Sequence, residues 1–261
     1  MTVGLGVVSF LNSRPLVYSL QKDIRFNLNY SVPSRCALDL QARAVDVGLI
    51  PSIEYARAIN PYQIVPGLAI AASGPVLTVR LYHATPLDDV RRVALDTSSR
   101  TSASLIKILL RERYGADPVW VDAAPHLPAM IEIADAALLI GDPVFGELNS
   151  ELPSIDLAAE WKEHTGLPFV FAFWAGYAGT LDGDGIDALQ AAKDAGVAHV
   201  DEIALAYAAE KGGDPALYRR YLSKHIHFSL GEGEIEGLRL FYAKAYQHDL
   251  IDSVPHLDFF S

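Results

Sequence analysis

Cysteine is nearly absent from this sequence, since Cys36 is the only one in 261 residues. A single cysteine excludes a disulfide within the chain and leaves no pair of thiolates to hold a metal ion. Basic residues are also scarce, because 21 Lys and Arg stand against 32 Asp and Glu and give a net charge of −11. Nucleic acids and anionic membranes usually require a basic surface, so neither is an expected partner.

Long apolar runs are missing as well. No run reaches the ~20 residues that are needed to cross a bilayer. The segment from Met1 to Leu11 has no basic start and no small-residue cleavage site. The sequence therefore predicts no membrane span and no signal peptide, and we expect a cytoplasmic protein.

The common motifs of catalysis and of cofactor binding are missing too. The sequence contains no P-loop, no HExxH and no Gly-x-Ser-x-Gly elbow. Gly4-x-Gly6 lies inside a predicted strand and lacks a third glycine at position 9, which argues against a dinucleotide site. His225 and His227 lie among helical signals without an acidic third ligand. We therefore predict neither a metal nor an organic cofactor.

The chain does contain short apolar runs that alternate with helical patterns. Residues 3–10, 26–32, 45–50 and 76–83 are predicted strands, and the last of these alternates strongly between apolar and polar side chains. Helix-start signals follow the first three runs. Strands that alternate with helices predict an α/β protein with a largely parallel sheet.

The character of the chain changes beyond Gly179, where the apolar spacing is helical throughout. A strand-free tail of this size needs an existing sheet to pack on. We therefore predict a discontinuous lobe I, formed by residues 1–82 and 178–261, with a helical C-terminal part. Residues 83–177 would form an inserted α/β lobe II.

Two extended segments, near residues 76–83 and 169–177, would join these lobes. The second segment carries the large aromatic side chains Phe173 and Trp174. Packing in the core is the more common use of such rings, but one of them in this position would also suit the wall of a cleft between the lobes.

The most polar of the predicted strand ends follows the apolar run 93–95. Hydroxyl side chains, one arginine and the first backbone N–H groups of a helix come together there, and such groups bind anions. The residues are Thr97, Ser98, Ser99, Arg100, Thr101 and Ser102. The alternative is that Thr97 or Ser98 only caps the helix and that Arg100 is solvated. Capping needs one or two of these side chains, so the full cluster favours an anion site.

Three other strand ends carry polar residues. Ser9 to Arg14 and Pro51-Ser52 lie in predicted lobe I, and Gly141-Asp142 lies in predicted lobe II. Ligands of α/β proteins bind beyond the carboxyl ends of strands, and clefts between lobes are favoured sites. We therefore predict a clamp that closes on a small carboxylated molecule.

Four segments of the chain resemble the signature segments of the chorismate dehydratase family. They are residues 8–16, 47–55, 96–102 and 140–142, in the expected order. The resemblance implies a two-lobed fold like that of type 2 periplasmic binding proteins, with a cleft between the lobes. It also implies the first reaction of the futalosine route to menaquinone, in which chorismate loses water to give 3-[(1-carboxyvinyl)oxy]benzoate.

The chemistry of that reaction suits the predicted clamp. Chorismate is a dianion, and its dehydration produces an aromatic ring without a redox cofactor. The ring C–H that is removed is conjugated to the ring carboxylate, so donors that stabilise charge on this carboxylate accelerate the step. On this hypothesis the catalytic residues are Asn12, Arg100 and Asp142. The predicted substrate-binding residues are Ser9, Arg14, Ser52, Thr97, Ser98, Ser99, Thr101 and Ser102.

Two questions stay open at this point. The base is either Asp142, which also suits a helix cap, or the enolpyruvyl carboxylate of the substrate itself. The function has two alternatives: the enzyme of the same pathway that releases 1,4-dihydroxy-6-naphthoate, and a carboxylate-binding protein without catalysis. The sequence does not determine the oligomeric state.

Overall fold

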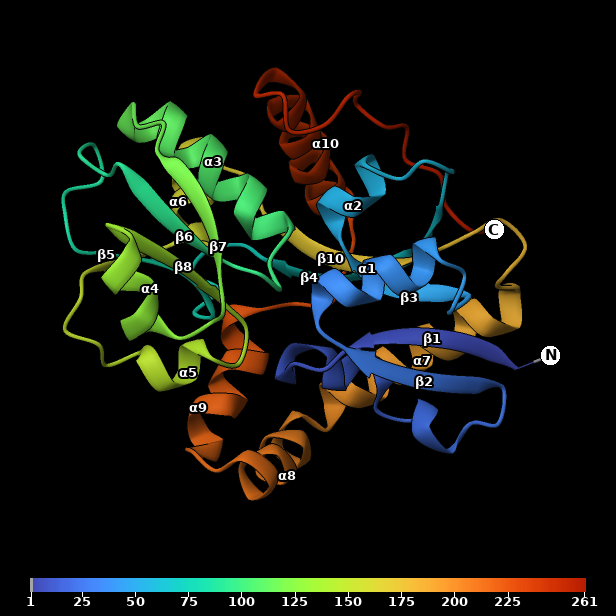
Figure 1. The fold of residues 1–261 in the computed structure, drawn as a ribbon. Helices are drawn as coiled ribbons and strands as arrows, with labels where there is room; N and C mark the ends of the chain where they lie inside the picture. The colour runs from blue at the N-terminus through green and yellow to red at the C-terminus, as the bar shows by residue number, and fades with distance from the viewer. Residues whose placement is uncertain (1) are drawn as a thin grey trace.

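The computed structural model describes residues 2–261, whose strands form two separate five-stranded sheets (Figure 1). The first sheet has the order β2-β1-β3-β10-β4, and the second has the order β7-β6-β8-β5-β9. The strands are β1 Val3–Val8, β2 Phe26–Ser31, β3 Val47–Pro51, β4 Gln63–Ala72, β5 Val79–His83, β6 Arg92–Asp96, β7 Val119–Ala123, β8 Ala136–Ile140, β9 Ser154–Asp156 and β10 Phe169–Gly176. The helices are η1 Leu11–Val17, η2 Leu20–Lys22, α1 Pro33–Gln41, α2 Ser52–Ala56, α3 Thr101–Tyr114, α4 Leu127–Ile133, α5 Val144–Glu147, α6 Leu157–Thr165, α7 Gly183–Ala198, α8 Val200–Lys211, α9 Pro215–Arg220, η3 Tyr221–His225 and α10 Glu232–Gln247. The two-lobed α/β architecture that the sequence predicts is confirmed.

In each sheet four of the five strands run in the same direction and one strand, β10 or β5, runs against them, so the expectation of a largely parallel sheet is confirmed. β1 runs parallel to β2 and β3, whereas β10 runs antiparallel to β3 and β4. In the second sheet β6 is parallel to β7 and β8, and β5 is antiparallel to β8 and β9. Every antiparallel pair involves β5 or β10, with which the chain enters a sheet from the other lobe. A strand that arrives this way needs no crossover helix to pair antiparallel.

β5 and β10 also show where the chain crosses between the lobes. The prediction assigned residues 79–82 to lobe I and residues 169–177 to lobe II. The pairing places β5 in the second sheet and β10 in the first sheet. An apolar or alternating run identifies a strand, but its partners lie far away in the sequence and leave no local mark. The predicted division at residues 82 and 178 therefore does not follow the sheets.

The helical tail contacts both lobes rather than lobe I alone. α10 packs against α3 of the second lobe and against β10 of the first lobe. Phe145 of α5 packs edge-on against Tyr218 of α9, with 4.9 Å between the ring centroids. Figure 1 shows α9 below the gap between the sheets and α10 above it. The tail therefore spans the two lobes on both sides of the crossing strands.

The crossing strand β10 is buried along its whole length. The side chains of Phe173 and Trp174 are both 0% exposed and belong to the main hydrophobic core. Of the two uses expected for these rings, the structure has core packing. No helix among residues 2–261 is both long and apolar enough to span a membrane.

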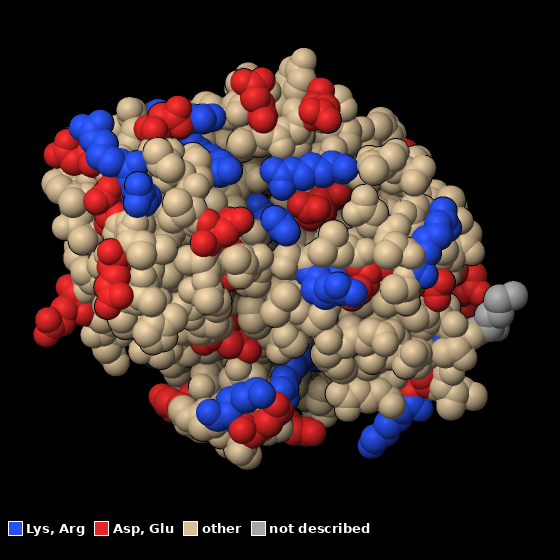
Figure 2. Space-filling model, viewed as in Figure 1, with Lys and Arg blue, Asp and Glu red and all other residues tan. Residues whose placement is uncertain are grey.

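Charged side chains of both signs are interspersed on the face shown in Figure 2. Lys and Arg do not gather there into one continuous patch. An anionic ligand that approaches this face of a chain with net charge −11 meets no broad positive field. Attraction to an anion must therefore come from groups inside a site.

A partly buried ion cluster around Glu112 of α3 connects the tail to the second lobe. Its carboxylate accepts hydrogen bonds from Lys244 Nζ at 2.6 Å, His248 Nε2 at 2.9 Å and His164 Nε2 at 2.7 Å. Burial opposes ionisation of Glu112, but these three hydrogen bonds outweigh it and lower its pKa to about 2. A carboxyl pKa that is lowered by folding means that the ionised form stabilises the fold.

Replacing Glu112 with glutamine is expected to lower the free energy of unfolding at about pH 7 by about 1–3 kcal/mol. The contribution of Glu112 is complete above its unfolded pKa of 4.5 and is lost as the pH falls toward about 2. The gap between wild type and variant should therefore narrow when urea unfolding is repeated at about pH 3. Glu236→Gln, on the exposed face of α10, is the matched control and should change little. A gap that does not depend on pH would contradict this account.

Candidate active site between the lobes

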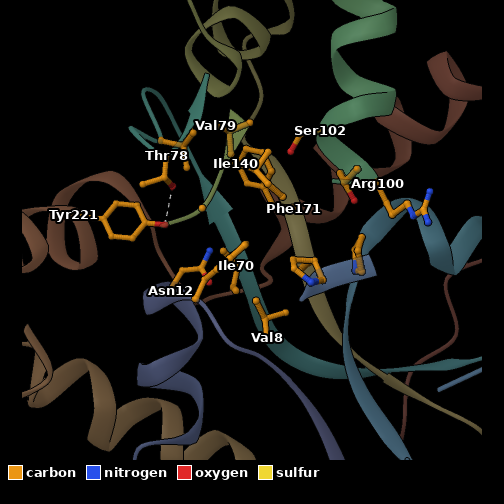
Figure 3. Close-up of a pocket in the computed structure, with 17 residues that line it drawn as sticks. Val8, Asn12, Ile70, Thr78, Val79, Arg100, Ser102, Ile140, Phe171 and Tyr221 are labelled. Atoms are coloured by element: carbon orange, nitrogen blue, oxygen red, sulfur yellow. Dashed lines mark hydrogen bonds between the residues drawn. The ribbon is translucent and has the colours of Figure 1, made fainter. Parts of the chain in front are cut away.

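A cavity that is partly open to solvent lies between the two lobes (Figure 3). Its middle is apolar and is lined by Val8, Ile70, Val76, Val79, Ile140 and Phe171. Figure 3 shows polar side chains at two ends of the cavity: Asn12, Thr78 and Tyr221 at one, and Arg100 and Ser102 at the other. Thr101, between Arg100 and Ser102 in the chain, also lines the cavity. Arg100 is the only charged residue among those that line the cavity. A cavity without a carboxylate of its own, in a strongly acidic chain, suits an anionic ligand with an apolar ring.

Asn12 reaches the cavity because the chain turns sharply at the end of β1. The hydroxyl of Ser13 donates to the backbone oxygens of Val8 and Phe10, which closes the turn into η1. Leu11 N–H is held by Asp142 of the other lobe. The Oδ1 atom of Asn12 is buried and has no hydrogen-bond partner among residues 2–261. An unpaired buried acceptor of this kind is costly and is typical of a site that a ligand completes.

Two hydroxyl groups of the predicted cluster, those of Ser98 and Ser99, form hydrogen bonds within their own loop and the start of α3 and do not line the cavity. Ser98 donates to Asp96 Oδ1 through its N–H at 2.8 Å and its hydroxyl at 2.7 Å. Ser99 Oγ accepts from Ala103 N–H at 3.1 Å and so caps α3. Thr97 is exposed. Burial raises the pKa of Asp96, which the bonds from Ser98 oppose. None of Thr97, Ser98 and Ser99 lines the cavity.

Thr101 and Ser52 connect the lobes at one wall of the cavity. Thr101 Oγ1 accepts from the N–H of Ile53 at 3.2 Å, and Ser52 Oγ lies 3.4 Å from the same atom. Ser52 in turn donates to the backbone oxygen of Val170 at 2.8 Å. Thr101 lines the cavity and Ser52 is buried behind it. The two hydroxyls therefore fix the start of α2 against the start of α3.

Ser102 and Arg100 complete the end of the cavity at the start of α3. Ser102 is buried and lines the cavity. Arg100 is exposed, and Figure 3 shows its side chain extending away from Asn12 and Tyr221. It makes no ion pair within residues 2–261. The first N–H groups of a helix have no intrahelical partner, so Thr101 and Ser102 present donors here.

Asp142, Arg14 and Ser9 are not part of this cavity. The carboxylate of Asp142 accepts from Leu11 N–H at 2.9 Å and from the Tyr207 hydroxyl at 2.6 Å. Burial raises the pKa of Asp142, while these two hydrogen bonds oppose the shift. Arg14 pairs with Glu210 of α8 at 2.6 Å, and Ser9 is exposed. Of the predicted site residues, the cavity is lined by Asn12, Arg100, Thr101 and Ser102. Asp142, Arg14 and Ser9 lie outside it.

Comparisons with known proteins agree with this arrangement. A protein-family model described as menaquinone biosynthesis matches residues 3–247. The chain belongs to this menaquinone-biosynthesis family. A curated relative, the chorismate dehydratase of Thermus thermophilus, is 30% identical in an alignment of 255 positions that covers 91% of this chain and 93% of the relative. The chorismate dehydratase of Campylobacter jejuni is 34% identical in an alignment of 176 positions that covers 64% of each chain.

Solved structures show the fold of this member of the menaquinone-biosynthesis family. A protein from Archaeoglobus fulgidus has a similar structure, with a TM-score of 0.79 at 18% identity. The match covers 96% of this chain and 98% of that protein's chain. The alkanesulfonate-binding protein SsuA from Xanthomonas axonopodis pv. citri has a TM-score of 0.70 at 15% identity, with 97% and 94% covered. The predicted fold like that of periplasmic binding proteins is confirmed.

Sequence reasoning missed Thr78, Phe171 and Tyr221, which line the cavity of this family member. Thr78 and Phe171 lie in or beside the two predicted crossing segments, so their segments were singled out but not their side chains. Tyr221 lies in the helical tail, where a buried aromatic residue ordinarily signals core packing. The sequence carries no signal that η3 returns to the cleft between the lobes.

Proposed function

We propose that this protein is a chorismate dehydratase, a hydro-lyase that converts chorismate to 3-[(1-carboxyvinyl)oxy]benzoate. Membership of the menaquinone-biosynthesis family and the similarity to two curated chorismate dehydratases support the proposal. One structural observation carries it. Asn12 of one lobe and the start of α3 in the other lobe line a single cavity with apolar walls and no acidic side chain.

The ring carboxylate of chorismate fits the end of the cavity at α3. There it would accept hydrogen bonds from the N–H groups of Thr101 and Ser102 and from the Ser102 hydroxyl, with Arg100 at the rim. Negative charge builds on this carboxylate as the ring C–H bond that is conjugated to it through a ring double bond breaks. Preorganised donors aimed at such charge are each worth about 10²–10³ in rate.

We assign the role of the base to the enolpyruvyl carboxylate of the substrate. No protein carboxylate lines the cavity, and both oxygens of Asp142 are engaged by Leu11 and Tyr207. In this proposal Asp142 holds the turn before Asn12 and takes no part in proton transfer.

Asp142→Asn is therefore expected to retain turnover of chorismate within about tenfold of wild type, whereas loss of a general base costs about 10²–10⁴. Asparagine keeps an oxygen that accepts from Leu11 N–H. The measurement is steady-state kinetics of the purified variant beside wild type. A loss of more than a thousandfold with an intact fold would return Asp142 to the role of base.

Incubation of the purified protein with chorismate tests the proposed function directly. The expected result is replacement of the diene absorbance by that of a benzene ring, with a product that has lost one water by mass. Chorismate that is bound and recovered unchanged would indicate a carboxylate-binding protein. Inert chorismate together with release of 1,4-dihydroxy-6-naphthoate from the cyclised futalosine derivative would indicate the other enzyme of the pathway. The cytoplasmic location stays a prediction.

A further inference from the structure

Tyr221 is a buried aromatic residue that the functional assignment does not use. It begins η3, a π-helical turn that directly continues α9, and π-helical turns are frequent at functional sites. Its side chain is 1% exposed, yet it lines the cavity between the lobes. Phe145 packs edge-on against its ring, with 5.3 Å between the centroids. The phenol is therefore held rigidly at the end of the cavity where Asn12 lies.

The hydrogen bonds at this phenol leave its own proton free. Thr78 Oγ1 donates to the Tyr221 oxygen at 2.9 Å, and Thr78 is itself 1% exposed (Figure 3). Burial raises the pKa of Tyr221, and hydrogen bonding from Thr78 and Asn12 opposes the shift without cancelling it. The phenol thus stays protonated, and no acceptor for its proton is found among residues 2–261.

Asn12 supplies the complementary free group. Its Oδ1 atom is buried without a partner, and Figure 3 shows the Asn12 and Tyr221 side chains turned toward the same end of the cavity. This end therefore offers one unused O–H donor and one unused acceptor. A hydroxyl group, which both accepts and donates, satisfies the pair. A carboxylate only accepts, so it would leave Asn12 Oδ1 unpaired and suits the donors at the start of α3 instead.

We propose that Tyr221, oriented by Thr78, donates a hydrogen bond to the ring hydroxyl that leaves during dehydration, while Asn12 accepts from it. The inference rests on the proposed function. In the reaction the enolpyruvyl carboxylate of the substrate takes the proton as the ring C–H bond breaks, the C–OH bond breaks, and a ring double bond forms. The carboxylate then gives that proton to the departing hydroxide, which leaves as water. Tyr221 keeps its proton throughout and stabilises the negative charge that builds on the departing oxygen. Thr78 is a positioning residue, because it acts through Tyr221.

Tyr221→Phe is expected to lower kcat for chorismate by about 10²–10³, with a much smaller change in KM. The benzoate product has no ring hydroxyl, so its affinity, measured by calorimetric titration, should stay within about twofold of wild type. Tyr218→Phe is the matched control. Tyr218 packs on the same Phe145 but donates to Gly212 O at 3.0 Å outside the cavity, and its loss should leave kcat unchanged.

Variants of Thr78 provide a second test that leaves the tyrosine in place. Thr78→Val removes the hydroxyl that orients the phenol and should lower kcat, whereas Thr78→Ser keeps the hydroxyl and should restore it. Wild-type protein that does not turn over chorismate would refute the proposed function. If wild type is active and Tyr221→Phe has the same kcat as Tyr218→Phe, the proposed role of Tyr221 is refuted and the proposed function is not. Equal loss of product affinity and kcat in Tyr221→Phe would also refute it, because the role would then be structural.

Discussion

Asn12→Asp is expected to lower kcat/KM for chorismate by more than ~100-fold. The substitution preserves shape but places a carboxylate in a cavity whose lining residues include no acid. Two like charges ~4 Å apart at an effective dielectric constant of ~20 repel by about 4 kcal/mol. The aspartate would face a dianionic substrate, and it would also remove the amide N–H groups beside Tyr221.

A surface variant provides the control for this charge change. Asn27 lies on β2 and is exposed, so Asn27→Asp adds the same charge away from the cavity. Its kcat/KM should stay within about twofold of wild type, since exposed charges at a distance are screened. If Asn12→Asp and Asn27→Asp turn out equally active, Asn12 does not face the ligand.

Gly141→Ala is expected to lower turnover by more than ~100-fold, because it would prevent the lobes from coming together. Gly141 follows β8 with φ of +67°, and a Cβ atom built there would overlap the ring of Phe10 from the other lobe. A side chain in this left-handed conformation costs ~1–2 kcal/mol. Overlap with a ring adds about 1–3 kcal/mol unless the neighbours separate. Opening of the lobes relieves the overlap without unfolding the protein.

The thermal midpoint of Gly141→Ala should therefore fall much less than its turnover, and the radius of gyration in small-angle X-ray scattering should increase. Gly146→Ala is the control, because a Cβ atom at Gly146 meets nothing within 4 Å and this glycine does not have a positive φ. It should match wild type in activity and in size. A Gly141→Ala protein with wild-type turnover would show that the closed arrangement is not the active one.

The sequence predicted the polar strand ends because strand-to-helix junctions have local signals. Pro15, the Ser99 region and the apolar runs before them identify where helices begin, and Asn12 and Ser102 follow from those positions. The sequence did not predict which of the neighbouring hydroxyl groups line the cavity and which form hydrogen bonds within the loop. Ser98 and Ser99 are chemically equivalent to Ser102 in a sequence, and only the path of the loop decides that they bond to Asp96 and Ala103.

Residues that depend on long-range packing were also beyond the sequence. Asp142 is a carboxylate at a strand end and so suits the role of a base in the sequence. In the structure Leu11 N–H and the Tyr207 hydroxyl, from distant segments, donate hydrogen bonds to it. The position of Tyr221 in the cleft depends on the tail crossing both lobes. A strand pattern likewise identifies β5 without naming its partners β8 and β9.

The most direct test of the central claim is a crystal structure of the protein grown with the benzoate product. The account predicts the ring between Phe171 and Ile70, with the ring carboxylate on the N–H groups of Thr101 and Ser102. A product bound instead in the surface groove beside Arg14 and Lys22, with the cavity between the lobes unchanged, would contradict it.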